Sequence, residues 1–143
     1  MGIKGTKGRL DKASIGIELC AYGPLKLING KYYAWPKDYT STVIPDSDVY
    51  KLQRDFRGFS YYESLTDDQI TSLEGLLEFL ITKYKIPVQK SFDYTWFDYN
   101  ESVIKNTTPG IWTHTTVRKD KFDLYPDDRI IAMLNRLAKK YGK

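Results

Sequence analysis

The residues best suited to chemistry gather in one late stretch, Gly110–Asp123 (GIWTHTTVRKDKFD). It holds His114, the only histidine of the 143-residue chain, and ends at Asp123. A neutral imidazole and a carboxylate are ordinary zinc ligands. Lys121, two residues before Asp123, is placed to meet negative charge that develops on a reacting oxygen. Two ligands do not complete a zinc site, so further ligands must be sought elsewhere.

A second candidate carboxylate lies in an early stretch, Ala13–Ala21 (ASIGIELCA). Aliphatic residues alternate there with small or polar ones, which predicts a strand with one aliphatic face and Glu18 on the other. A glutamate in such a strand must face solvent, a partner or a site. Cys20 shares its face, and thiolate is a good zinc ligand. A lone strand cysteine is far more often a small buried hydrophobe, however, and we favour that role for Cys20.

Composition and charge bound the class of protein. A chain of 143 residues and 16.6 kDa suits one domain with a single core. The net charge of +4 and the pI of about 9.0 suit nucleic acid or an anionic cell envelope, but no nucleic-acid-binding motif or basic helix accompanies them. The single cysteine excludes an internal disulfide framework. No apolar run approaches the roughly 18 residues of a membrane span, and no signal peptide is visible, so we expect a soluble chain.

The first half of the chain predicts few regular elements. Residues 1–12 are glycine-rich and basic, which indicates a flexible lead-in. Leu25–Trp35 predicts a hairpin that turns at Asn29-Gly30. Pro36–Asp48 is expected to be irregular. Val49–Tyr62 mixes charges with aromatic residues without clean periodicity, which favours a surface loop that shapes a cleft.

The second half carries the clearest helix signals. Thr66-Asp67-Asp68-Gln69 is a capping box followed by apolar residues at helical spacing, which predicts a helix over about 67–84. Lys90–Pro109 is insertion-like, and Ile111–Thr115 is expected to be a short strand. Pro126-Asp127-Asp128 opens a last helix. The core stripe of that helix is formed by Ile130, Ile131, Leu134 and Leu137. The order of these elements predicts an α/β domain over residues 13–143.

Three stretches together resemble the zinc-dependent N-acetylmuramoyl-L-alanine amidases, the type 2 amidase family shared with peptidoglycan recognition proteins and phage endolysins. Ser14–Leu19 (SIGIEL) looks like that family's central strand. Leu65–Gln69 (LTDDQ) looks like the start of its long helix, and His114 with Arg118–Asp123 (RKDKFD) looks like its ligand loop. The resemblance implies an α/β fold with a mixed central β-sheet flanked by helices.

The resemblance also implies a role for each candidate residue. His114 and Asp123 would be two of the three protein ligands of a catalytic zinc ion whose fourth position holds water. Glu18 would be the general base, and Lys121 would stabilise the oxyanion of the tetrahedral intermediate. The substrate would be peptidoglycan, cut at the amide between N-acetylmuramic acid and L-alanine.

The chain departs from the family in one respect. The family takes its first zinc ligand from a histidine on an earlier strand, and here no histidine precedes His114. The sequence is therefore expected to represent the C-terminal two thirds of the family domain, truncated at its N-terminus. Either Met1 is an internal or mis-assigned start, or the missing part is supplied by a separate chain. A cell-wall lytic amidase of phage or bacterial origin is the leading hypothesis. The alternative is a catalytically inactive peptidoglycan-binding or virion structural module with a degenerate amidase fold.

Overall fold

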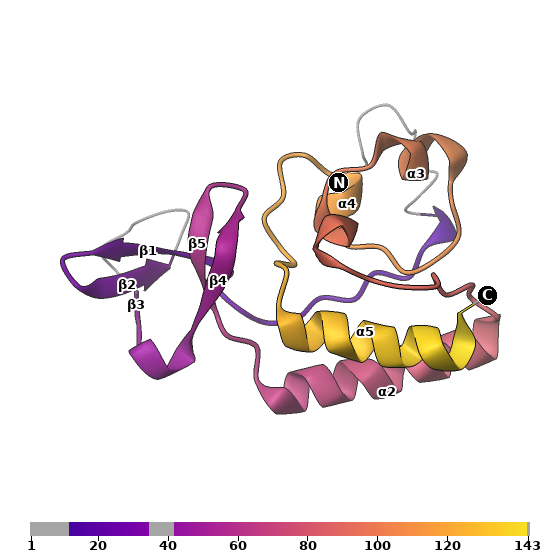
Figure 1. Ribbon diagram of the computed structural model, residues 1–143, viewed down its shortest axis with the longest axis horizontal. Coiled ribbons are helices and arrows are strands. Elements are labelled where there is room, and N and C mark those ends of the chain that lie inside the picture. Colours follow the sequence, from indigo (N-terminus) through magenta and orange to yellow (C-terminus); the bar gives the residue numbers. More distant parts are fainter. Residues whose placement is uncertain (1–11, 35–41, 143) are drawn as a thin grey trace.

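The computed structural model describes residues 12–34 and 42–142, which form a mixed α/β structure (Figure 1). Its strands are β1 (Pro24–Ile28), β2 (Lys31–Ala34), β3 (Val43–Ile44), β4 (Val49–Phe56) and β5 (Phe59–Glu63). Its α-helices are α2 (Asp67–Tyr84), α3 (Glu101–Asn106), α4 (His114–Val117) and α5 (Asp128–Tyr141), and short 3-10 turns are η1 (Asp46–Asp48) and η2 (Tyr94–Phe97). Residues 1–11 of the predicted lead-in, and Trp35 with the first part of the segment predicted to be irregular, lie outside the described ranges.

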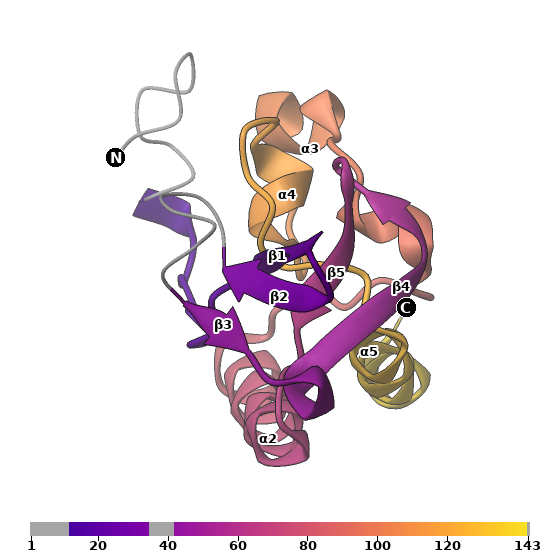
Figure 2. The ribbon, with the colours of Figure 1, turned by 90° about the vertical axis from the view of Figure 1, so that its left-hand side faces the viewer.

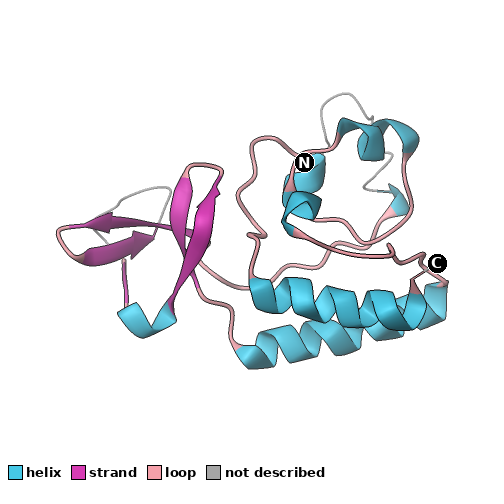
Figure 3. Cartoon of the chain, in the orientation of Figure 1, coloured by secondary structure: helices cyan, strands magenta, loops and turns pink. Residues whose placement is uncertain are grey.

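The strands form one open antiparallel sheet in the order β3-β2-β1-β5-β4. Figure 1 shows this sheet at one end of the molecule and the helices at the other, and Figure 3 marks the same division by secondary structure. The α/β class is confirmed. The mixed sheet is not, because every pairing between the described strands is antiparallel. Tight turns join β1 to β2 and β4 to β5, whereas a parallel pair needs a long crossover.

Both tight turns have the backbone geometry of a two-residue hairpin. In the first, Asn29 and Gly30 have φ of 49° and 75°, as a type I′ turn requires, and the predicted hairpin is confirmed. In the second, Arg57 and Gly58 have φ of 52° and 85°. The surface loop predicted over 49–62 is therefore wrong. The sequence pattern of β4 is not that of a regular strand, because an irregularity in its pairing between Lys51 and Phe56 interrupts the alternation of side chains.

The two long helices match their predictions. α2 begins at a complete capping box, in which the Thr66 hydroxyl accepts from the Gln69 amide and the Gln69 side chain accepts from the Thr66 amide. Lys85, with a φ of 55°, ends the helix. α5 lies alongside α2 (Figures 1 and 2). The two helices are joined by an ion pair of 2.6 Å between Arg136 and Glu74 and by a second one between Lys140 and Glu78.

Removal of the capping box gives a first test of the fold. Thr66→Ala is expected to lower the free energy of unfolding by about 1 kcal/mol, because the Gln69 amide loses its acceptor. Urea unfolding followed by circular dichroism measures this change. Thr71→Ala, at an exposed position inside the same helix, is the matched control and should be neutral or slightly stabilising, since alanine has the higher helix propensity. Equal effects for the two variants would contradict a specific role for the cap.

One hydrophobic core joins the sheet to the helices. Tyr62 of β5 is fully buried and its ring stacks on that of Tyr125, with centroids 4.4 Å apart. Burial raises the pKa of both phenols above their ordinary value. The other members come from β4, α2, α5 and the connections between them: Leu52, Phe56, Leu65, Ile70, Ile81, Val88, Phe92, Phe97, Ile130, Met133, Leu134, Leu137 and Ala138. This core is the scaffold on which the candidate site rests.

Two predicted strands are absent. Residues 14–23 carry no helix or strand, so the strand expected over Ala13–Ala21 is wrong. Of its aliphatic side chains, Ile15 and Ile17 are 53% and 37% exposed, and Leu19 is partly buried against the core. The strand expected over Ile111–Thr115 is also wrong, because α4 begins within it. No helix in the described part of the chain is long and apolar enough to cross a membrane.

Candidate metal centre

His114 and Asp123 come together at the two ends of one loop. His114 is the first residue of α4, and its Nδ1 lies 3.2 Å from Oδ2 of Asp123. Their side chains are 43% and 65% exposed, so a solute can reach both. Zinc bonds of about 2.0 to 2.1 Å at a tetrahedral angle place two ligand atoms about 3.3 Å apart. The pair therefore fits two corners of a zinc tetrahedron as well as it fits a hydrogen bond.

A group of buried threonines fixes the position of His114. Thr113 caps α4 by accepting from the Thr116 amide at 3.0 Å, and its hydroxyl also lies within 2.8 Å of those of Thr115 and Thr116. Thr115 donates to the carbonyl of Phe97, and Thr116 donates to that of Trp96, each at 2.8 Å. Because the three hydroxyls are buried and fully engaged, the short helix has one orientation.

The loop between α4 and Asp123 is held by its own charges. Arg118 donates to both carboxylate oxygens of Asp120, at 2.8 and 2.5 Å. These hydrogen bonds lower the pKa of Asp120 to about 2, and the nearby charge of Lys121 acts in the same direction. The ammonium of Lys119 lies 4.6 Å from the centre of the Tyr99 ring. Asp120 is thereby engaged with Arg118, and the Asp123 carboxylate is the one that faces the imidazole.

The loop also contacts the turn between β4 and β5, which sequence reasoning missed as a functional element. Arg57 donates to the carbonyl groups of Thr115, Arg118 and Lys119. The ring of Phe59 meets that of Phe122 edge to face, with centroids 5.4 Å apart. The segment Arg57-Gly58-Phe59 is called the hairpin tip below.

The other two predicted site residues are placed less tightly. Lys121 is half-buried in the same loop, two residues before Asp123. Glu18 is exposed in the extended segment 14–23, and among the described residues no hydrogen bond or ion pair joins it to His114, Lys121 or Asp123. The structure thus unites the two predicted ligands. The convergence of Glu18 with them stays a prediction.

No third protein ligand completes the pair within the described ranges. No group of three or more His, Cys, Asp or Glu side chains suited to a metal ion occurs there. Cys20 is exposed and free, so its expected burial is wrong, and it belongs to no such group. The strand that was to bury it does not form. The pair has the donor types and the spacing of zinc ligands, and a complete site needs a third donor from elsewhere.

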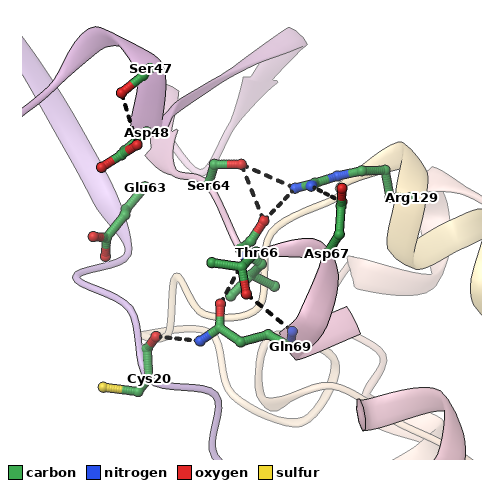
Figure 4. A pocket seen from close by; sticks show the side chains of 10 residues that line it. Cys20, Ser47, Asp48, Glu63, Ser64, Thr66, Asp67, Gln69 and Arg129 are labelled. Atoms are coloured by element: carbon green, nitrogen blue, oxygen red, sulfur yellow. Dashed lines mark hydrogen bonds and ion pairs between the residues drawn. The ribbon is translucent and has the colours of Figure 1, made fainter. Parts of the chain in front are cut away.

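A cleft lies elsewhere in the described structure (Figure 4). It has a volume of about 390 Å³, and none of the four predicted site residues lines it. Cys20, Glu63 and Arg129 are in its wall. The Arg129 guanidinium is engaged by Asp127 at 2.7 Å, by Asp67 at 2.9 Å and by the Leu65 carbonyl at 2.9 Å. This cationic group therefore ties the start of α5 to the start of α2 and is not available to a ligand.

Comparison with known proteins gives no match to a family model, a curated protein or a solved structure. The amidase resemblance therefore rests on the three motifs described above, and the chemical case rests on the geometry of His114 and Asp123.

Proposed function

We propose that this chain is part of a zinc-dependent N-acetylmuramoyl-L-alanine amidase that acts on peptidoglycan at the bacterial cell wall, in the manner of a phage endolysin. The observation that supports this best is the pair of accessible ligand atoms, His114 Nδ1 and Asp123 Oδ2, 3.2 Å apart. Lys121 belongs to the same loop, and a cation there suits a hydrolytic site because it would stabilise a developing oxyanion.

Each residue has one task in this proposal. His114 and Asp123 would hold a zinc ion, which would supply a water molecule that ionises near neutral pH. Glu18 would accept the proton of that water and pass it to the leaving amine of L-alanine. The Lys121 ammonium stabilises the negative charge that develops on the carbonyl oxygen of the lactyl group.

We place the third protein ligand outside the described residues, on a part of the protein beyond Met1–Lys143 or on a second polypeptide. The chain contains no other histidine, and the described residues contain no third donor beside the pair. This same observation favours the alternative, a module that binds peptidoglycan without hydrolysing it. The two functions differ in whether an added donor restores catalysis, because a small donor molecule can take the place of a missing histidine.

The test is an assay on purified peptidoglycan with zinc, in the presence and absence of added imidazole. We expect imidazole-dependent release of peptides with a free L-alanine amino group, abolished by a chelator. Sedimentation of the protein with peptidoglycan is measured in parallel. Binding without release under all conditions would support the inactive module instead. Neither binding nor release would overturn both proposals.

A further inference from the structure

The hairpin tip contacts the segment from His114 to Asp123, called the ligand loop here, at several points, although the two are about 60 residues apart in the sequence. Arg57 has a φ of 52° and is followed by Gly58 at 85°, so the turn is tight and its first side chain is well fixed. The Arg57 guanidinium donates to the Thr115 carbonyl at 2.8 Å, to that of Arg118 at 3.2 Å and to that of Lys119 at 2.5 Å. One side chain thereby holds three carbonyl groups of a segment about 60 residues away.

The Thr115 carbonyl belongs to α4 and that of Arg118 to its C-cap, whereas that of Lys119 lies just beyond the helix. α4 is a single turn, His114–Val117, and the last four carbonyl groups of a helix have no intrahelical donor. Only a planar guanidinium has enough donors in a fixed arrangement to serve several of them together. A lysine at the same position would carry the charge on a single nitrogen and would reach fewer acceptors.

The second contact of the hairpin tip lies next to Asp123. Phe59 meets Phe122 with ring centroids 5.4 Å apart, and Phe122 is the residue before Asp123. Arg57 holds the loop just after His114, and Phe59 holds it just before Asp123. The buried threonines hold α4 itself, and the hairpin tip adds contacts to the loop beside each of the two ligand residues.

We infer that Arg57 is a positioning residue for the metal ligands, which keeps the His114–Asp123 pair arranged before the metal arrives. The inference rests on the proposed function only in so far as the pair binds metal. It does not require that the chain hydrolyse peptidoglycan. A pre-arranged pair binds zinc more tightly than a mobile one, because less conformational freedom is lost when the metal binds.

The experiment measures zinc affinity through the imidazole signal of isotope-labelled protein, in which His114 is the only histidine. Unlabelled imidazole is added to fill the third position. Arg57→Ala is expected to weaken zinc binding about 10- to 100-fold, in the range found for residues that orient metal ligands. Added guanidinium, at concentrations too low to denature, should restore part of the affinity, while the same concentration of sodium chloride should not. Arg57→Lys should lie between the wild type and Arg57→Ala.

Arg54→Ala is the matched control. Arg54 lies on β4, three residues before Arg57, and its guanidinium stacks 3.7 Å from the centre of the Tyr94 ring. It should leave zinc affinity unchanged even if it lowers the unfolding temperature. If Arg57→Ala does not fold, Arg57→Lys and Phe59→Leu carry the test.

The outcomes separate the inference from the proposed function. Unchanged zinc affinity in folded Arg57 variants would overturn the inference and leave the amidase proposal standing. Weakened affinity in a protein that never hydrolyses peptidoglycan would support the inference and overturn the amidase. A wild-type protein that binds no zinc, with or without imidazole, would overturn both.

Discussion

Replacing Asp123 by alanine is expected to lower zinc- and imidazole-dependent hydrolysis of peptidoglycan by roughly 10³-fold, since losing about 4 kcal/mol of metal-derived transition-state stabilisation has that effect. Asp123 provides Oδ2, the atom 3.2 Å from His114 Nδ1. Without it one protein ligand remains, and a single histidine does not hold zinc at useful concentrations. Release of L-alanyl peptides from purified cell wall measures the activity, and zinc titration of the His114 signal measures the affinity.

Asp120→Asn is the matched control for this change. Asp120 is an aspartate of the same loop, but Arg118 engages both of its oxygens and it takes no part in the pair with His114. The Asp120 side chain is 65% exposed, and an asparagine keeps an oxygen that accepts from Arg118 and so still holds the loop, so we expect near-normal zinc affinity and activity. If Asp120→Asn and Asp123→Ala lose activity equally, the loop matters as a whole and the assignment of Asp123 as a ligand is wrong.

The sequence predicted the elements whose signals are local. The capping box at Thr66, the proline and aspartates that open α5 and the Asn29-Gly30 turn each act within a few residues, and the structure has all three. Local sequence signals gave wrong predictions for some strands, because a strand forms only where it pairs with another strand. The alternation in Ala13–Ala21 is that of a strand, but a strand forms only with a partner, and none of the described strands pairs with it.

The residues of the candidate site likewise include some that a local motif predicts and one that it does not. The pairing of His114 with Asp123 follows from a motif within one loop, and the structure brings the two residues together. Arg57 could not be found in this way, because its role depends on contacts with carbonyl groups about 60 positions later. Its only signal in the sequence is the Arg57-Gly58 pair, which is compatible with a turn. Backbone carbonyl groups leave no side-chain pattern, so partners that bind them are invisible until the chain is folded.

The second large effect is expected at Asp127, which joins the two long helices. Its carboxylate is fully buried, caps α5 by accepting from the Arg129 amide at 2.8 Å, and pairs with the Arg129 guanidinium at 2.7 Å. Arg129 in turn reaches Asp67, the first residue of α2, at 2.9 Å. The hydrogen bonds that the Arg129 guanidinium donates to Asp127 raise the pKa of Arg129, as expected for a charge held by a buried partner.

Asp127→Ala is expected to lower the free energy of unfolding by about 3 kcal/mol. Loss of the cap accounts for about 1 kcal/mol, and the remainder arises because Arg129 stays partly buried with one carboxylate fewer. The Arg129 side chain is 37% exposed, so water replaces part of what is lost and the value lies at the lower end for a broken buried pair. Denaturant unfolding at neutral pH measures the change, and for a domain of about 5–15 kcal/mol total stability it is large.

Two further substitutions separate the charge from the cap. Asp127→Asn keeps a side-chain acceptor for the Arg129 amide but removes the negative charge, so it should fall between the wild type and Asp127→Ala. Asp128→Ala removes the neighbouring, exposed carboxylate, which accepts from the Gln53 side chain at 3.2 Å, and should stay within about 0.5 kcal/mol of the wild type. A loss near 1 kcal/mol for Asp127→Ala, with none for Asp127→Asn, would show that Asp127 acts as a cap alone. In that case α2 and α5 are held together by their apolar faces, and the chain of charges from Asp67 to Asp127 adds nothing to the stability of the domain.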